Sequence, residues 1–348
     1  MCIRDRFREV HVTATSRELV HQTLNFAGPA RAPRDLWTLP IAETAHPAEL
    51  ASILAAYPPD IVGIDGHERE RAPTRGDQYA IGEFTDEWGA TFVSVQPGVI
   101  GEVKQPLIRD WANDVPRVHI PTAWLTIDHD AVNRACGRSD KFTLAGCNPR
   151  PFEQLQFLRG TADLYMDLTD PPPQMLDFMA TLHAFYCDLL ETWARTDVDA
   201  LRIMDDWGSQ RSLLISPAMW RTYFKPLYRD YVQIAHAAGK KFFMHSDGHI
   251  LAIYPDLIEI GVDALNSQIF CMGVEQLAPY AGQITFWGEI DRQRLLAFAT
   301  PDEVEAAVCQ VYAHLWRDGG CIAQCEFGAG AQPANVERVF ATWDRLTG

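Results

Sequence analysis

The sequence lacks the features that mark several broad classes of protein. No run approaches the roughly 18 apolar residues that span a bilayer, and residues 1–11 lack the uninterrupted apolar stretch of a signal peptide. Eight cysteines in 348 residues are too few for a disulfide scaffold. Cations are in deficit, because 30 Lys and Arg stand against 46 Asp and Glu, a net charge of −16. These absences predict a cytoplasmic protein that binds neither membranes nor nucleic acid.

The chain also shows few signs of internal domain boundaries. No repeat of roughly 20 to 50 residues and no low-complexity linker divides it, so we expect a single domain over residues 15–348. No apolar run is followed by a glycine-rich phosphate loop or a Walker lysine, which argues against a nucleotide-binding sheet. Residues 1–14 show no clear helix or strand pattern and are predicted to be a non-native or disordered N-terminus.

What is present is an alternation of strand and helix patterns. From residue 140 onward, short apolar runs alternate with longer amphipathic segments such as 217–238 and 301–317, which is typical of βα units. Strands are expected at 142–147, 200–204, 241–245, 264–266, 284–287 and 321–325. The first half favours a helix at 16–25 with Ser16 as N-cap, a strand at 60–65 and a β-hairpin over 79–95. We predict an α/β fold, a closed (β/α)8 TIM barrel with N-terminal decorations, with an open doubly wound sheet as the alternative.

Polar residues follow five consecutive strand patterns, at the end of the strand where βα barrels carry their catalytic groups. They are Asp205, Asp206, Trp207 and Gln210, then His245 and Asp247, then Gln268, then Glu289 and Asp291, and finally Cys325 and Glu326. Adjacent carboxylates repel one another unless a cation or a proton lies between them, so at least one of Asp205 and Asp206 is expected to face the site. The alternative role for Asp291 is the N-cap of a helix over residues 292–298.

Three of these residues suggest a metal site. His245 and Asp247 lie two positions apart, so their side chains share one side of an extended segment. With Cys325 they form a mixed nitrogen, oxygen and sulfur set that suits zinc, which takes three protein ligands and an open position in catalytic sites. Glu289 or Glu326 would complete the set. The alternatives are a core histidine at 245 and an inert buried cysteine at 325.

Six blocks along the chain form a series: TSRELV at 15–20, RAPRDLW at 31–37, DEWG at 86–89, DDWGSQ at 205–210, HSDG at 245–248 and WGEID at 287–291. In this order they resemble the uroporphyrinogen decarboxylase superfamily, particularly its methyltransferase-like branch, over residues 15–347. The resemblance implies a (β/α)8 barrel with its cleft at the C-terminal rim. It leaves the activity open, because the superfamily contains both tetrapyrrole decarboxylases and zinc-dependent corrinoid methyltransferases.

The resemblance also separates the two chemistries. Decarboxylases of this family carry an arginine-rich N-terminal segment that holds the substrate carboxylates, and it is absent here; Arg31 and Arg34 stand in a setting that matches the other branch. Methyltransferases of the family bind zinc through a His-x-Cys pair and a later cysteine, and the metal activates a thiol. His245 and Cys325 match that pattern, whereas Asp247 replaces the first cysteine and hardens the site.

The leading hypothesis is a zinc-dependent methyltransferase that acts with a corrinoid or a methoxylated small molecule, and with a corrinoid carrier protein as partner. The predicted roles are catalytic for Asp205, Asp206 and Asp86, substrate-binding for Trp88, Trp207, Gln210, Gln268 and Glu289, and metal-binding for His245, Asp247 and Cys325. Asp86 and Trp88 are expected to close the pocket through the hairpin. The alternatives are a uroporphyrinogen decarboxylase, a non-catalytic corrinoid-binding or tetrapyrrole-binding protein, and a metal-dependent lyase or hydrolase.

Overall fold

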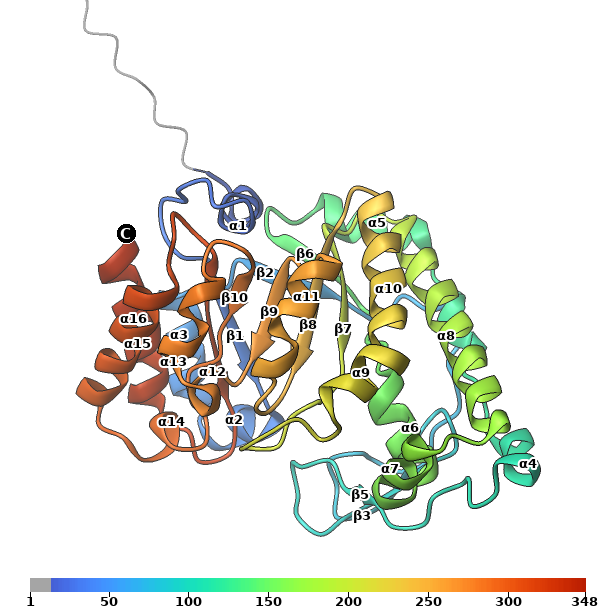
Figure 1. Ribbon diagram of the computed structural model, residues 1–348. Coiled ribbons are helices and arrows are strands. Elements are labelled where there is room, and N and C mark those ends of the chain that lie inside the picture. Colours follow the sequence, from blue (N-terminus) through green and yellow to red (C-terminus); the bar gives the residue numbers. More distant parts are fainter. Residues whose placement is uncertain (1–13) are drawn as a thin grey trace, which may run out of the picture.

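The computed structural model describes residues 14–348, in which eight parallel strands form a central barrel (Figure 1). The strands are β1 (Arg34–Thr38), β2 (Ile61–Ile64), β6 (Phe142–Ala145), β7 (Ala200–Met204), β8 (Lys241–Ser246), β9 (Ala264–Ser267), β10 (Thr285–Trp287) and β11 (Cys321–Phe327). They are ordered β1-β11-β10-β9-β8-β7-β6-β2. The predicted TIM barrel is thereby confirmed. The prediction for the N-terminus falls almost wholly outside the described residues.

Helices surround the barrel. They are α1 (Ser16–Leu24), α2 (Pro40–Ala45), α3 (Pro47–Ala56), α4 (Trp111–Asp114), α5 (His129–Gly137), α6 (Pro151–Arg159), α7 (Thr161–Thr169), α8 (Pro173–Ala194), α9 (Pro217–Tyr223), α10 (Lys225–Ala237), α11 (Tyr254–Ile260), α12 (Ile269–Met272), α13 (Val274–Leu277), α14 (Leu295–Phe298), α15 (Pro301–Leu315) and α16 (Pro333–Thr347). None of the helices in the described part of the chain is long and apolar enough to cross a membrane.

The seam of the barrel lies between β1 and β2 and is closed at the N-terminal end of these strands by Asp60. The Asp60 N–H donates to the Arg34 carbonyl at 2.7 Å, and the Arg34 N–H donates to the Asp60 carboxylate at 2.7 Å. The Arg31 guanidinium binds both oxygens of the same carboxylate at 2.6 and 2.8 Å. β1 is not among the strands predicted from the sequence, because its five residues carry too many polar side chains to form an apolar run.

Side chains alternate between the two faces of each strand and form two buried layers. The inner layer fills the barrel with Ile61, Phe142, Leu144, Ala200, Phe243, Ala264, Trp287 and Ile322. Val20 and Leu24 of α1 join this layer and close the N-terminal opening. The outer layer packs the remaining strand residues against the helices. Polar side chains on the inner face can therefore reach solvent only at the opposite, C-terminal opening.

Two local predictions in the first half can be compared with the structure. Thr15, not Ser16, caps α1: Thr15 Oγ1 accepts from the Glu18 N–H at 3.2 Å, and the Glu18 carboxylate accepts from the Thr15 N–H at 2.8 Å. The hairpin is confirmed, since β3 (Gly82–Thr85) pairs antiparallel with β4 (Thr91–Ser94). A further short strand, β5 (Glu102–Val103), extends it to a three-stranded sheet. Figure 1 shows this sheet at the end of the barrel away from α1.

Candidate active site at the C-terminal opening of the barrel

Three side chains converge where β7 and β8 end. Asp206 follows β7, His245 is the penultimate residue of β8, and Asp247 follows β8 directly. His245 Nε2 lies 3.4 Å from Asp206 Oδ1 and 3.6 Å from Asp247 Oδ1. One ligand atom from each residue lies within 4.8 Å of the other two, so the group is compact enough to hold a metal ion. We call these three residues the Asp-His-Asp cluster.

The loops that carry the two aspartates are locked together. The Asp247 N–H donates to Asp206 Oδ1 at 2.8 Å. Behind this contact, Gly208 and Gly248 cross so closely that a Cβ added at Gly208 would lie 2.4 Å from the His249 nitrogen. Gly248 also has φ +80°, a conformation that residues with a Cβ rarely adopt. Glycine at both positions is thus what lets the two carboxylates approach the same imidazole.

The orientation of the His245 ring is set by Asn266 on β9. The Asn266 amide nitrogen donates to the Trp287 carbonyl, which leaves Asn266 Oδ1 to face His245 Nδ1 at 2.6 Å. Because this oxygen can only accept, His245 Nδ1 carries a proton, and Nε2 is the atom that faces the two carboxylates. Metal-binding histidines are oriented in the same way, by an acceptor on the nitrogen that does not bind the metal.

The charges within the cluster reinforce one another. Burial opposes protonation of His245, but the hydrogen bond and charge of Asp206 and the charge of Asp247 outweigh it and raise the pKa of His245 to about 9. Burial likewise opposes ionisation of Asp206, and the contact with His245 still holds the pKa of Asp206 below its usual value. Without a metal, an imidazolium between two carboxylates is therefore the stable arrangement at neutral pH.

Arg292 connects the cluster to two further carboxylates. Its guanidinium binds Asp247 Oδ2, lies 2.8 Å from Glu289 Oε2, and places Nε 3.7 Å from Glu326 Oε1. Burial raises the pKa of Glu289 to about 8 despite the attraction of Arg292. Asp247 Oδ1 remains buried without a hydrogen-bond partner among the described residues. That oxygen is the carboxylate atom of the cluster that is available to bind a metal ion.

A cavity of about 470 Å³ lies beside α6 and α8, and none of the three cluster residues lines it. Glu153 of α6 lines it, and the pKa of Glu153 is raised to about 7 by burial and by the charge of Asp206, which places Glu153 close to the cluster. Asp86 and Trp88 line the same cavity, as expected for a hairpin that covers the rim. Asp86 also organises the hairpin turn, since its Oδ1 accepts from the N–H groups of Trp88 and Ala90 at 3.1 and 2.7 Å.

A second cavity, of about 430 Å³, adjoins the cluster on the side of Arg292. It is lined by Gln210, Gln268 and Glu289, three of the residues predicted to bind substrate. Gln210 Nε2 donates to Gln268 Oε1 at 3.2 Å, and Gln268 Oε1 also accepts from the Gly248 N–H at 3.1 Å. Four of the five substrate-binding residues predicted from sequence thus line one of the two cavities, Trp88 the first and Gln210, Gln268 and Glu289 the second, and Trp207 lines neither.

The structure does not bring Cys325 to this cluster. On β11, Ile322 belongs to the inner layer, whereas Cys325 belongs to the outer layer and is fully buried. Burial raises the pKa of its thiol above the usual value, which disfavours the thiolate that binds metal. The next residue, Glu326, lies on the inner face and reaches Arg292. Asp206 therefore occupies the place in the candidate metal site that was predicted for Cys325.

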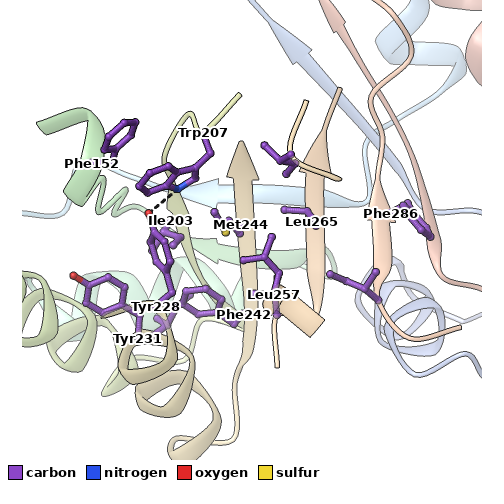
Figure 2. Close-up of a cluster of buried hydrophobic side chains, with 14 of the residues drawn as sticks. Phe152, Ile203, Trp207, Tyr228, Tyr231, Phe242, Met244, Leu257, Leu265 and Phe286 are labelled. Carbon is purple, nitrogen blue, oxygen red and sulfur yellow. Dashed lines mark hydrogen bonds between the residues drawn. The ribbon is translucent and has the colours of Figure 1, made fainter. Parts of the chain in front are cut away.

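Asp205 and Trp207, on either side of Asp206, lie in the outer layer instead of the opening. The Asp205 carboxylate accepts from the first N–H groups of α6 at 2.8 and 2.7 Å and from the Tyr228 hydroxyl at 2.5 Å. Trp207 stacks on Phe152 with ring centres 3.9 Å apart and donates to the Tyr228 hydroxyl at 2.8 Å, the contact drawn dashed in Figure 2. Both residues position α6 and α10 and do not face the Asp-His-Asp cluster.

Several residues of the site were not singled out from the sequence. Asn266 and Glu153 form contacts that no local pattern predicts, because their partners come from other βα units. Arg292 has one local partner, Glu289, whereas Asp247 and Glu326 come from other units. Glu326 was named from the sequence, as an alternative to Glu289 for completing the metal set, and it contacts Arg292. In the buried strand CIAQCEF, Gln324 and Glu326 occupy one face and apolar residues the other, so alternation alone selects Glu326 over Cys325.

Comparison with known proteins agrees with the fold and identifies the family. A family model described as uroporphyrinogen decarboxylase (URO-D) matches residues 89–346. The chain belongs to the uroporphyrinogen decarboxylase family. A search of curated protein sequences gives no significant match. The resemblance noted from the sequence blocks is therefore confirmed at the level of the family.

Solved structures resemble the chain in fold. A methyltransferase from Methanosarcina mazei is 12% identical, with a TM-score of 0.65, and the alignment covers 96% of this chain and 99% of that one. A B12-independent methionine synthase from Shewanella sp. W3-18-1 is 9% identical over 63% of this chain and 66% of that one; its TM-score of 0.42 is too low to support an argument. The Methanosarcina match shows a barrel shared along its whole length.

Proposed function

We propose that this chain is a metal-dependent methyltransferase of the uroporphyrinogen decarboxylase family. The observation that carries the proposal is the Asp-His-Asp cluster, in which an oriented imidazole nitrogen and two carboxylates converge at the C-terminal opening of the barrel. Two cavities suit a reaction that transfers a group between two molecules. The full-length likeness to a methyltransferase supports this choice within the family.

The cluster fits a divalent cation with one nitrogen and two oxygen ligands, His245 Nε2, Asp206 and Asp247. The unpartnered Asp247 Oδ1 and the imidazole held at Nδ1 by Asn266 both favour a bound ion. An imidazole ligand favours zinc over magnesium. A zinc ion there would lower the pKa of a substrate thiol, so that its thiolate could accept a methyl group.

The residues of the chain supply the remaining functions. Arg292 binds Asp247 through the oxygen that does not face His245, so it holds this carboxylate in place and leaves Oδ1 free. Glu153, whose pKa of about 7 is raised by burial and by the charge of Asp206, is the proposed acceptor of the proton that a thiol releases at neutral pH. A corrinoid, free or on a carrier protein, or a methoxylated small molecule is the proposed methyl source.

Decarboxylation of a tetrapyrrole is the second candidate, favoured by the family model that the chain matches. Such a substrate needs several free cations for its carboxylates. Here Arg31 is bound to Asp60 and Arg34 to Asp344, near the barrel seam and away from the cluster. Arg292 is bound to three carboxylates. The described site therefore offers a polycarboxylate little to bind.

The test combines metal analysis with two turnover assays on the purified protein. We expect about one zinc per chain, methyl transfer from methylcobalamin to a thiol, and no turnover of uroporphyrinogen. His245→Ala should lose both metal and methyl transfer. The matched control is His236→Ala, which removes a histidine that also pairs with an aspartate, Asp263 at 2.8 Å, but far from the opening. Zinc retained in His245→Ala, or methyl transfer unchanged by it, would refute the proposal.

A further inference from the structure

A buried carboxylate inside the barrel anchors two tryptophans beside the candidate site. Asp35 of β1 is 6% exposed. Trp37 Nε1 and Trp287 Nε1 donate to the same oxygen of this side chain, Oδ2, at 2.9 and 2.7 Å. The two indoles meet edge to face, with ring centres 5.2 Å apart. One oxygen of β1 thus fixes the orientation of a tryptophan on its own strand and of another on β10.

The first of these tryptophans packs against the metal-binding histidine. The ring centres of Trp37 and His245 lie 5.4 Å apart, with the ring planes inclined by 51°. Since β1 and β8 are not neighbours in the barrel, this contact crosses its interior. In a closely packed interior, a ring held between other side chains cannot turn without opening a gap. The indole of Trp37, itself held by Asp35, therefore restricts the tilt of the His245 imidazole.

The second tryptophan acts on the same imidazole through its main chain. The Trp287 carbonyl accepts from the Asn266 amide, and this contact turns Asn266 Oδ1 toward His245 Nδ1 at 2.6 Å. Trp287 is 2% exposed and Asn266 is fully buried. The residue that orients Asn266 is therefore anchored at its indole by Asp35. Two chains of contacts lead from Asp35 to His245, one to the face of the ring and one to Nδ1.

From these contacts we infer that Asp35 is a positioning residue for His245. By holding both indoles, it fixes the plane in which His245 Nε2 faces Asp206 and Asp247. The inference rests on the proposed function in one respect only, that Nε2 binds a metal ion. Changing the outer partners of metal-binding histidines typically alters metal affinity about 10- to 100-fold. A carboxylate that served only to satisfy two indoles would affect stability and leave metal affinity unchanged.

Two substitutions at position 35 separate these roles. Asp35→Asn keeps an acceptor oxygen, and one oxygen is sufficient because both indoles donate to Oδ2. Asp35→Leu has a similar shape and no acceptor. In a competition titration of the metal-free proteins with a chelating dye, we expect the zinc affinity of Asp35→Asn to stay close to that of the wild type and that of Asp35→Leu to fall about 10-fold or more. The visible absorption of bound Co²⁺, which depends on coordination geometry, should change only in Asp35→Leu. Equal zinc affinity in all three proteins, or an equal loss in both variants, would overturn the inference.

The matched control is Asp256→Leu. Asp256 is 5% exposed, lies on α11 and pairs with two cations from neighbouring helices, so the control also removes a buried carboxylate that has partners. Its zinc affinity should equal that of the wild type, and a loss as large as that of Asp35→Leu would contradict positioning. Trp37→Leu removes the ring that packs on His245 and serves where Asp35→Leu does not fold. We expect it to weaken zinc about 10-fold, and an unchanged affinity would overturn the inference.

A measurement without metal keeps the inference separate from the proposed function. In the metal-free protein labelled with ¹⁵N-histidine, the proton on His245 Nδ1 faces Asn266 Oδ1. Its exchange with water, followed by NMR, should be slow in the wild type and in Asp35→Asn and faster in Asp35→Leu. The same exchange rate in all three proteins would overturn the inference. A wild-type protein that binds no zinc but shows the expected order would refute the proposed function and support the positioning of His245 by Asp35.

Discussion

Arg292→Met is the perturbation that most directly examines how the site is held together. The substitution keeps much of the apolar stem of the side chain and removes the guanidinium that contacts Asp247, Glu289 and Glu326. The side chain of Arg292 is 22% exposed, and that of Glu289 is 2% exposed. Removing the cation leaves three carboxylates facing one another in a largely dry opening, so the variant should be less stable than the wild type.

The size of the effect follows from burial. Removing one partner of a fully buried ion pair costs about 3–5 kcal/mol. Here the cost is smaller, because Arg292 keeps some contact with solvent and Glu289, with a pKa of about 8, can hold a proton at neutral pH. We expect a loss of about 2–3 kcal/mol. With an unfolding entropy of about 2 cal/mol/K per residue, this lowers the Tm of a 348-residue chain by about 3–4 °C.

The matched control is Arg294→Met, two residues further along the same loop. The side chain of Arg294 is 77% exposed and pairs with Asp291 at 3.7 Å, so its removal should change the stability by less than about 0.5 kcal/mol. Thermal unfolding followed by circular dichroism at pH 7 measures both variants. If the two melt within 1 °C of each other, Arg292 does not hold the three carboxylates in the way that we describe.

Three further substitutions separate structural residues from residues of the site. Cys325→Ala should leave the zinc content unchanged, because the side chain faces the outer layer; zinc loss measured by metal analysis would restore Cys325 as a ligand. Burial raises the pKa of Asp35 to about 6, so the wild type loses stability as the pH rises from 4 to 7 and this carboxyl ionises. The free energy of unfolding of Asp35→Asn should therefore rise by about 2–3 kcal/mol relative to that of the wild type over this pH range. Urea titrations in which the difference between the two proteins is the same at pH 4 and at pH 7 would contradict this. Asp205→Ala should lose about 2–4 kcal/mol, because two N–H groups of α6 and the Tyr228 hydroxyl lose their acceptor; an unchanged urea midpoint would show that the carboxylate is not needed there.

Local pattern was sufficient for most of the barrel. Strands β6 to β11 carry apolar runs that are buried on both faces, so each stands out against the amphipathic helices that follow. β1 was missed because its inner face carries Asp35 and Trp37, which the barrel interior accommodates: Asp35 Oδ2 accepts from the indoles of Trp37 and Trp287 at 2.9 and 2.7 Å. No property of RDLWT by itself reveals a buried partner that lies 252 residues away.

The candidate site was likewise predicted from the sequence only in part. The spacing of His245 and Asp247 placed both on one side of the chain, and the structure retains that pair. The sequence did not determine which aspartate, or which strand end, would join this pair. Asp205 and Asp206 are equivalent in sequence, yet alternation sends Asp205 outward to Tyr228 and Asp206 inward to His245.

The sequence alone determined the family, the βα order and the strand ends that carry polar residues, because hydrophobic periodicity and short blocks are properties of neighbouring residues. The acidity of the chain indicated only that nucleic acid was an unsuitable partner. Tertiary structure decided which acids meet, because the closed barrel brings Asp247, Glu289 and Glu326 onto Arg292. Distances between groups on different strands depend on barrel closure and side-chain direction, and neither property can be read from any single segment of the chain.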